Sequence, residues 1–169
     1  MNKIYIYIIV LFSAGCSTSK KVDEIVSNNL ELNESLLKSS LYSRNEFYIY
    51  ETYFIDGVRT YYCELNNENY NIVRDTIIYK SVSGSVYNNN FKLSPKQVSD
   101  SIKRLKQIMN TFSIEGYRSD WRDTGIALKI YLTDGCEMFY VPNQSSFINQ
   151  YSDLEKLKRG WYSRCVETQ

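Results

Sequence analysis

The chain has 169 residues, and 20 Lys and Arg against 19 Asp and Glu give it a formal net charge of +1 at pH 7. A chain so close to neutral lacks the positive field that attracts nucleic acids, so we expect no nucleic-acid partner. Its count of 0 His excludes Ser-His-Asp and Cys-His nucleophilic sites and every histidine-ligated metal site. A glycine-rich phosphate loop after a predicted strand is missing as well, and we expect no cofactor.

The first 15 residues have the order of a signal peptide. Lys3 supplies a positive charge, and the apolar block from Ile4 to Phe12 has the length of a signal-peptide core. A membrane-spanning helix needs about 20 apolar residues, so this block is too short to remain as an anchor. Small residues at 13–15 then precede Cys16. We therefore predict that residues 1–15 are a signal peptide that is removed.

The stretch from Ser13 to Cys16, "SAGC", resembles the lipobox of bacterial lipoproteins. Ser13 stands where a leucine is usual, which resembles the looser form of small Bacteroidetes-type lipoproteins. The resemblance implies that the Cys16 sulfur receives a diacylglycerol with acyl chains such as palmitate, and that the new terminal amine is acylated. Several acyl chains anchor a protein stably, so it also implies a cell-envelope location, lipid-anchored to the outer membrane. The alternative is an ordinary secretory signal with an incidental Cys16.

The remaining chain divides into a tether and one domain. Residues 16–40 are rich in Ser, Asn, Glu and Lys, and we interpret them as the lipidated cysteine followed by a polar tether. Residues 41–169 are enough for one domain with a hydrophobic core, and two domains would be crowded.

Strand-forming residues dominate the first half of this domain. Residues 46–65 predict a hairpin with Asp56-Gly57 as its loop, in which Phe54 faces Arg59. After an Asn-rich loop at 66–69, residues 70–87 predict one or two further strands, interrupted near Arg74-Asp75 and at Gly84.

A helix is predicted from Ser94, because Ser94-Pro95-Lys96-Gln97 combines an N-cap, a proline at the first helical position and the Gln of a capping box. The apolar residues that follow recur at helical spacing and predict one buried stripe: Val98, Ile102, Leu105, Ile108, Met109 and Phe112.

The last third of the chain predicts a central hairpin, a short helix and a closing strand. The hairpin covers residues 126–141 around Asp134-Gly135, with Cys136 on one face. Its other face would carry Ile126, Leu128, Ile130, Leu132, Phe139 and Val141. Ser152 begins the short helix, which ends before Gly160, and residues 161–166 form the strand. The predicted fold is α+β, an antiparallel sheet built from β-hairpins with about two helices packed on one face.

Three cysteines remain besides Cys16, and an envelope location permits a disulfide among them. The sequence leaves the pairings of Cys63, Cys136 and Cys165 open, because a bridge depends on distances in space. Cys165 is the favoured partner, since its bridge would hold the C-terminal strand to the sheet. Three reduced, buried thiols are the alternative.

The segment from Glu115 to Gly125 mixes aromatic, basic and acidic residues of the types enriched where sugars or proteins bind. Its candidate binding residues are Tyr117, Arg118, Asp120, Trp121 and Arg122. The alternative is a turn whose Arg and Asp side chains pair with each other while Trp121 covers the core. The 16 Tyr are open to two interpretations as well: half-buried sheet positions, or an exposed ladder that binds glycan or peptide.

These features predict a lipid-anchored cell-envelope protein with a small non-catalytic binding or accessory domain. Its expected partners are the membrane, through the lipid on Cys16, and an envelope protein or glycan. One alternative is an inhibitor or immunity-type lipoprotein that uses the loop around Trp121 as a plug. Another is a cell-wall glycan enzyme that depends on carboxylates. The S-x-x-K match at Ser35–Lys38 is not an active site, because the chain is too short for that enzyme fold and lacks K-T-G.

Overall fold

The computed structural model describes residues 24–26, 36–54, 57–79, 92–119, 125–142 and 153–165. These residues form an α+β structure in which strands dominate. A 9-stranded sheet has the order β4-β3-β2-β1-β5-β6-β7-β9-β8, and its described strand pairs are antiparallel.

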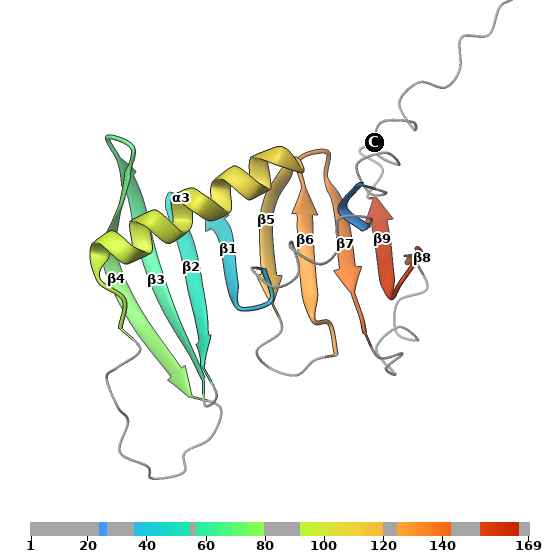
Figure 1. Ribbon diagram of the computed structural model, residues 1–169, viewed down its shortest axis with the longest axis horizontal. Coiled ribbons are helices and arrows are strands. Elements are labelled where there is room, and N and C mark those ends of the chain that lie inside the picture. The colour runs from blue at the N-terminus through green and yellow to red at the C-terminus, as the bar shows by residue number, and fades with distance from the viewer. Residues whose placement is uncertain are drawn as a thin grey trace, which may run out of the picture.

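One long helix, α3, lies diagonally across one face of the sheet from β4 toward β5, and residues 24–26 are helical beside β7 and β9 (Figure 1). The elements are β1 (Ser39–Arg44), β2 (Phe47–Phe54), β3 (Gly57–Asn66), β4 (Asn69–Tyr79), α3 (Pro95–Thr111), β5 (Ile114–Ser119), β6 (Leu128–Leu132), β7 (Cys136–Tyr140), β8 (Glu155–Lys156) and β9 (Trp161–Cys165). Within the described ranges, no helix is both long enough and apolar enough to span a bilayer.

The helix α3 begins where the local signals predict. The side chain of Ser94 accepts a hydrogen bond from the backbone N–H of Gln97 at 3.3 Å, and the Gln97 side chain accepts one from the Ser94 N–H at 2.8 Å. The predicted stripe is confirmed, since four of its residues are buried and the other two pack against the core at its edge: Val98, Ile102, Leu105, Met109, Ile108 and Phe112.

The first predicted hairpin pairs with a register two residues away from the expected one. Phe54 lies opposite Gly57 instead of Arg59, so the chain reverses one residue earlier than an Asp56-Gly57 loop requires. A shift by two keeps every side chain on its face, because successive strand residues alternate between faces. Tyr50 and Tyr61 therefore lie together in the core.

The second predicted hairpin differs in a more consequential way. The expected two-residue loop would place Phe139 and Val141 on the face of Ile130, but the turn holds three residues and ends in Gly135, whose φ is +81°. Ile130 consequently pairs with Met138, and an odd shift reverses the faces of β7. The expected shared face was wrong: Phe139 and Val141 lie on the opposite face, in a small second cluster.

The predicted second helix was also wrong. Residues 155–156 form the short strand β8, paired with β9. Leu154 packs with Phe139 on one face of the sheet, whereas Leu157 packs on the other face with the main core. A helix would bring residues three apart onto the same side, but a strand separates them. Because Leu154 and Leu157 pack on opposite faces of the sheet, their packing favours an extended chain over a helix.

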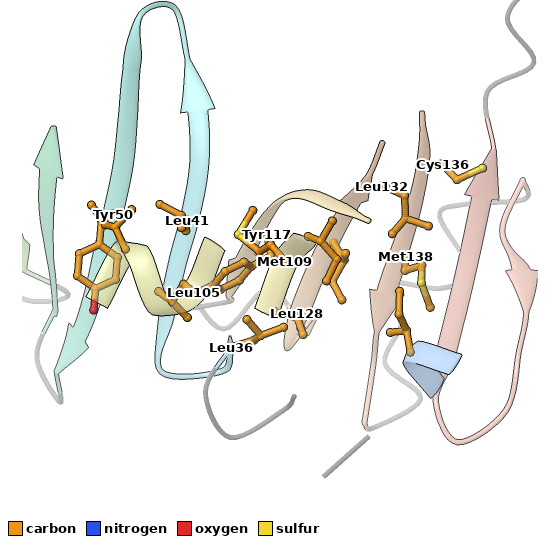
Figure 2. Packing of buried hydrophobic residues seen from close by; sticks show 14 of the residues in the cluster. Leu36, Leu41, Tyr50, Leu105, Met109, Tyr117, Leu128, Leu132, Cys136 and Met138 are labelled. Atoms are coloured by element: carbon orange, nitrogen blue, oxygen red, sulfur yellow. The ribbon is translucent and has the colours of Figure 1, made fainter. Parts of the chain in front are cut away.

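The main core fills the face that α3 covers. Figure 2 shows Leu105 and Met109 of α3 among side chains of the sheet, with Leu41, Tyr117 and Leu128 in the same cluster. Three buried core residues come from the stretch predicted as a tether: Ile25, Val26 and Leu36. The packed structure therefore includes apolar side chains from the sequence before residue 41.

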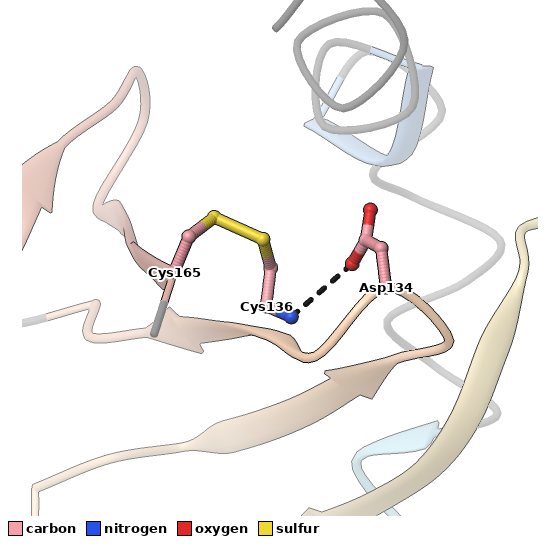
Figure 3. Close-up of a disulfide and its surroundings, with 3 residues drawn as sticks. All are labelled: Asp134, Cys136 and Cys165. Atoms are coloured by element: carbon pink, nitrogen blue, oxygen red, sulfur yellow. Dashed lines mark hydrogen bonds between the residues drawn. A yellow bond between two sulfur atoms is a disulfide. The ribbon is translucent and has the colours of Figure 1, made fainter. Parts of the chain in front are cut away.

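The disulfide joins Cys136 of β7 to Cys165 of β9 (Figure 3). The two residues are direct cross-strand partners, and their Cα atoms lie 4.2 Å apart. Cys165 is thus the partner that holds the last strand to the sheet. Cys136 had been expected on the face opposite Ile130, but the three-residue turn places it on the core face. Cys63 is a buried free cysteine.

Candidate binding face

A groove lies on the sheet face opposite α3, which we call the open face. Its volume is about 450 Å³, and its walls are Tyr42, Arg44, Asn45, Phe47, Ile49, Tyr62, Val73 and Arg74. A row of cross-strand partners crosses four strands and forms its centre: Tyr42, Ile49, Tyr62 and Arg74. Their sequence neighbours Leu41, Tyr50 and Tyr61 lie in the main core. Strand alternation alone therefore directs the groove residues away from α3.

A β-bulge shapes one wall of the groove. Tyr62 pairs with Arg74 and Cys63 pairs with Ile72, so Val73 is an extra residue in β4. A bulge sets two residues of one strand against one residue of its partner. Val73 and Arg74 accordingly both line the groove around Tyr62, and Val73 is 55% exposed although it is apolar.

Three exposed arginines surround the aromatic rings of this region. The guanidinium carbon of Arg74 lies 4.1 Å from the ring centre of Tyr62, and that of Arg118 lies 4.9 Å from the ring centre of Tyr42. Arg44 lines the groove at the end of β1. Among the described residues, no carboxylate comes within ion-pair distance of these arginines. Within the described part of the chain, Arg74 and Arg118 therefore contact aromatic rings and not carboxylates.

A hydrogen-bonded cluster holds Tyr42 in position. The buried Glu51 accepts hydrogen bonds from the hydroxyls of Tyr42 at 3.4 Å and Tyr53 at 3.1 Å, and Tyr53 also bonds Ser40. Burial and then the charge of Glu51 raise the pKa of Tyr42 to about 12, although Arg118 acts in the opposite direction. Tyr42 is thus a neutral hydroxyl at physiological pH, which donates a hydrogen bond to Glu51 and carries Arg118 over its ring.

The other half of the open face, over β6, β7 and β9, neutralises its own charges. A carboxylate oxygen of Glu137 lies 2.7 Å from Nζ of Lys129, and the other pairs with the guanidinium of Arg164. A second guanidinium nitrogen of Arg164 lies 3.1 Å from a carboxylate oxygen of Asp153. Burial raises the pKa of Glu137, but the hydrogen bonds and charges of Lys129 and Arg164 outweigh it and lower that pKa. Among the described residues, these four side chains form one ion-pair network. The contrast singles out the groove half as the candidate site.

Of the candidate residues from the sequence, the structure describes Tyr117 and Arg118. Tyr117 is fully buried in the core, and its hydroxyl lies 2.7 Å from Ser39 Oγ. Arg118 is exposed on the open face, over Tyr42. Adjacent strand residues point to opposite faces, so the structure separates these two side chains. The candidates Asp120, Trp121 and Arg122 lie outside the described residues.

Sequence reasoning missed the groove, because its walls come from β1 to β4 and not from the segment 115–125. One signal was present: Ile72 and Val73 are consecutive apolar residues followed by Arg74, which breaks the alternation of a half-buried strand. In addition, β1 begins at Ser39, inside the stretch interpreted as a tether.

Within the described ranges, no three Cys, Asp or Glu side chains gather as metal ligands. A comparison with models of protein families found no match, and comparisons with curated proteins and with solved structures found no significant match either.

Proposed function

We propose that this chain is a lipid-anchored cell-envelope protein whose open face binds another envelope component without catalysing a reaction. The observation that supports the binding role is the groove, where Arg44 and Arg74 flank aromatic rings without a carboxylate partner among the described residues. Lys129 and Arg164, on the same face, are paired. Arginine and tyrosine are enriched at recognition surfaces, where a guanidinium can stack on an aromatic ring.

The architecture in this proposal assigns one role to each face. Strands connected as β-hairpins carry helical cover on one side, where the core forms, and present the other side to the ligand. Glu51 supports this division, because its buried carboxylate accepts a hydrogen bond from the Tyr42 hydroxyl and forms no ion pair with an arginine of the described residues. A preorganised side chain loses less conformational entropy when a ligand binds.

The anchoring half of the proposal rests on the resemblance of residues 13–16 to a lipobox. It predicts that the mature chain begins at a Cys16 carrying acyl chains and stays with the membrane fraction. Mass spectrometry of the amino-terminal peptide and fractionation of a Cys16→Ala variant test this half. A variant that remains in the membrane fraction as strongly as the wild type would contradict lipid anchoring through Cys16.

Site-specific photo-crosslinking tests the binding half. A benzophenone amino acid replaces Phe47 in the groove or, as the matched control, Gln107 on the exposed face of α3. Irradiation of intact cells should give an adduct at position 47 and not at position 107. Adducts at neither position, or equally at both, would contradict a binding role for the groove.

A further inference from the structure

We propose that the groove binds a saccharide that carries a carboxylate group. This inference rests on the proposed binding function and names its ligand class. The groove volume, about 450 Å³, falls within the roughly 300–1,000 Å³ of small-molecule sites. It therefore suits one or two sugar rings.

The charges of the groove favour an acid. Arg44 and Arg74 are exposed, and neither forms an ion pair with a carboxylate of the described residues. The guanidinium carbon of Arg74 lies 4.1 Å from the ring centre of Tyr62, so this contact places the guanidinium at the groove wall. A guanidinium edge matches the two oxygens of a carboxylate, in a bidentate pair stronger than a neutral hydrogen bond.

The remaining walls suit a sugar. Tyr42, Phe47 and Tyr62 are half-buried and supply apolar ring surface, against which the C–H face of a pyranose can pack. The amide of Asn45 and the Tyr62 hydroxyl supply donors and acceptors for ring hydroxyls, and the Tyr42 hydroxyl oxygen supplies a further acceptor. Asn45 lies in the turn between β1 and β2, where its φ of +56° is a left-handed value that Asn tolerates, and it lines the groove.

The position of the groove disfavours an extended peptide. Its centre lies on the face of β1, β2, β3 and the edge strand β4, and the backbone N–H and C=O groups of a strand lie in the plane of the sheet, so the free edge of β4 does not point into the groove. A peptide recognised by strand addition needs a free sheet edge, and on a sheet face its own amides would lack backbone partners. The polar groups of a saccharide can instead be satisfied by the Arg, Asn and Tyr side chains.

The test is calorimetric titration of the protein with a glucuronic acid oligosaccharide and with the same oligosaccharide after its carboxyl groups have been reduced to alcohols. The second probe keeps the rings and removes only the charge. The acidic probe should bind at least about tenfold more tightly than the reduced probe, because the guanidinium pairs are lost. Arg74→Gln should weaken binding of the acidic probe by a similar factor, whereas Arg104→Gln, on the exposed face of α3, should leave it unchanged.

Four outcomes would overturn the proposal. They are equal affinity for the two probes, equal effects of the two arginine variants, no binding of either probe, and tighter binding of an oligoglutamate peptide than of the saccharide. A photo-adduct at position 47 together with any of them would reject only the saccharide and retain the binding function. Circular dichroism of Arg74→Gln shows whether a weakened affinity reflects unfolding, and Arg44→Gln provides a second variant with the same expectation.

Discussion

Cys136 and Cys165 lie opposite each other on β7 and β9, with Cα atoms 4.2 Å apart and their sulfurs joined. Among the described strands, the short strand β8 alone lies beyond β9, so this bridge secures that end of the sheet. The 29-residue separation means that the bridge also restricts the unfolded chain.

Removing this bridge should destabilise the domain. A Cys136→Ser, Cys165→Ser double variant should lose about 3 kcal/mol of unfolding free energy, because the closed loop no longer limits the unfolded ensemble. Urea unfolding of the wild type with and without reductant, beside the double variant, measures this. The reductant should not affect the variant, and an unchanged midpoint for the reduced wild type would contradict the expectation.

Cys63 should be chemically inert in the folded protein. It is fully buried in the core, and burial raises the pKa of its thiol to about 11, so almost no thiolate exists near neutral pH. Iodoacetamide at pH 8 followed by peptide mass spectrometry should find Cys63 unmodified in native protein and modified in urea. Rapid native labelling would show that the core around Cys63 opens readily.

Glu137 should make stability depend on pH in the acid range. The pKa of Glu137 in the folded protein lies below the ordinary value of 4.5. Its ionised carboxylate therefore adds its full share to the free energy of unfolding above pH 4.5, and this share is lost as the pH falls through the folded pKa. Glu137→Gln should cost about 1 kcal/mol at pH 7 and flatten the decline of unfolding free energy below pH 4.5. Urea unfolding at several pH values measures both. A variant that declines as steeply as the wild type would assign the acid sensitivity to other carboxyl groups.

Two glycines with left-handed backbones form a matched pair for mutation. Both Gly135 and Gly160 have φ near +80°, but a Cβ at Gly160 would lie 2.8 Å from the Val141 carbonyl oxygen, whereas one at Gly135 meets nothing within 4 Å. Gly135→Ala should cost about 1 kcal/mol from backbone strain alone. Gly160→Ala should cost about 2–4 kcal/mol, because the backbone must also move. Equal decreases in melting temperature for the two variants would contradict the expected clash between position 160 and the Val141 carbonyl.

The sequence by itself determined the features that short-range interactions control. The helix from Pro95 needs only Ser94, Gln97 and an apolar stripe at helical spacing, all within a few turns of one another. The strand-rich composition likewise indicated an antiparallel α+β sheet. The favoured role of Cys165 followed from its position near the chain end, but its partner depended on distance in space.

Only the tertiary structure decided registers, faces and the groove. A single additional turn residue before Cys136 moved Phe139 to the open face, since the side-chain period of a strand is two. Residues 155–156 form a strand because Leu154 packs on one face of the sheet and Leu157 packs on the other. The groove combines four strands and the bulge at Val73, so its geometry depends on cross-strand pairings that no local pattern encodes.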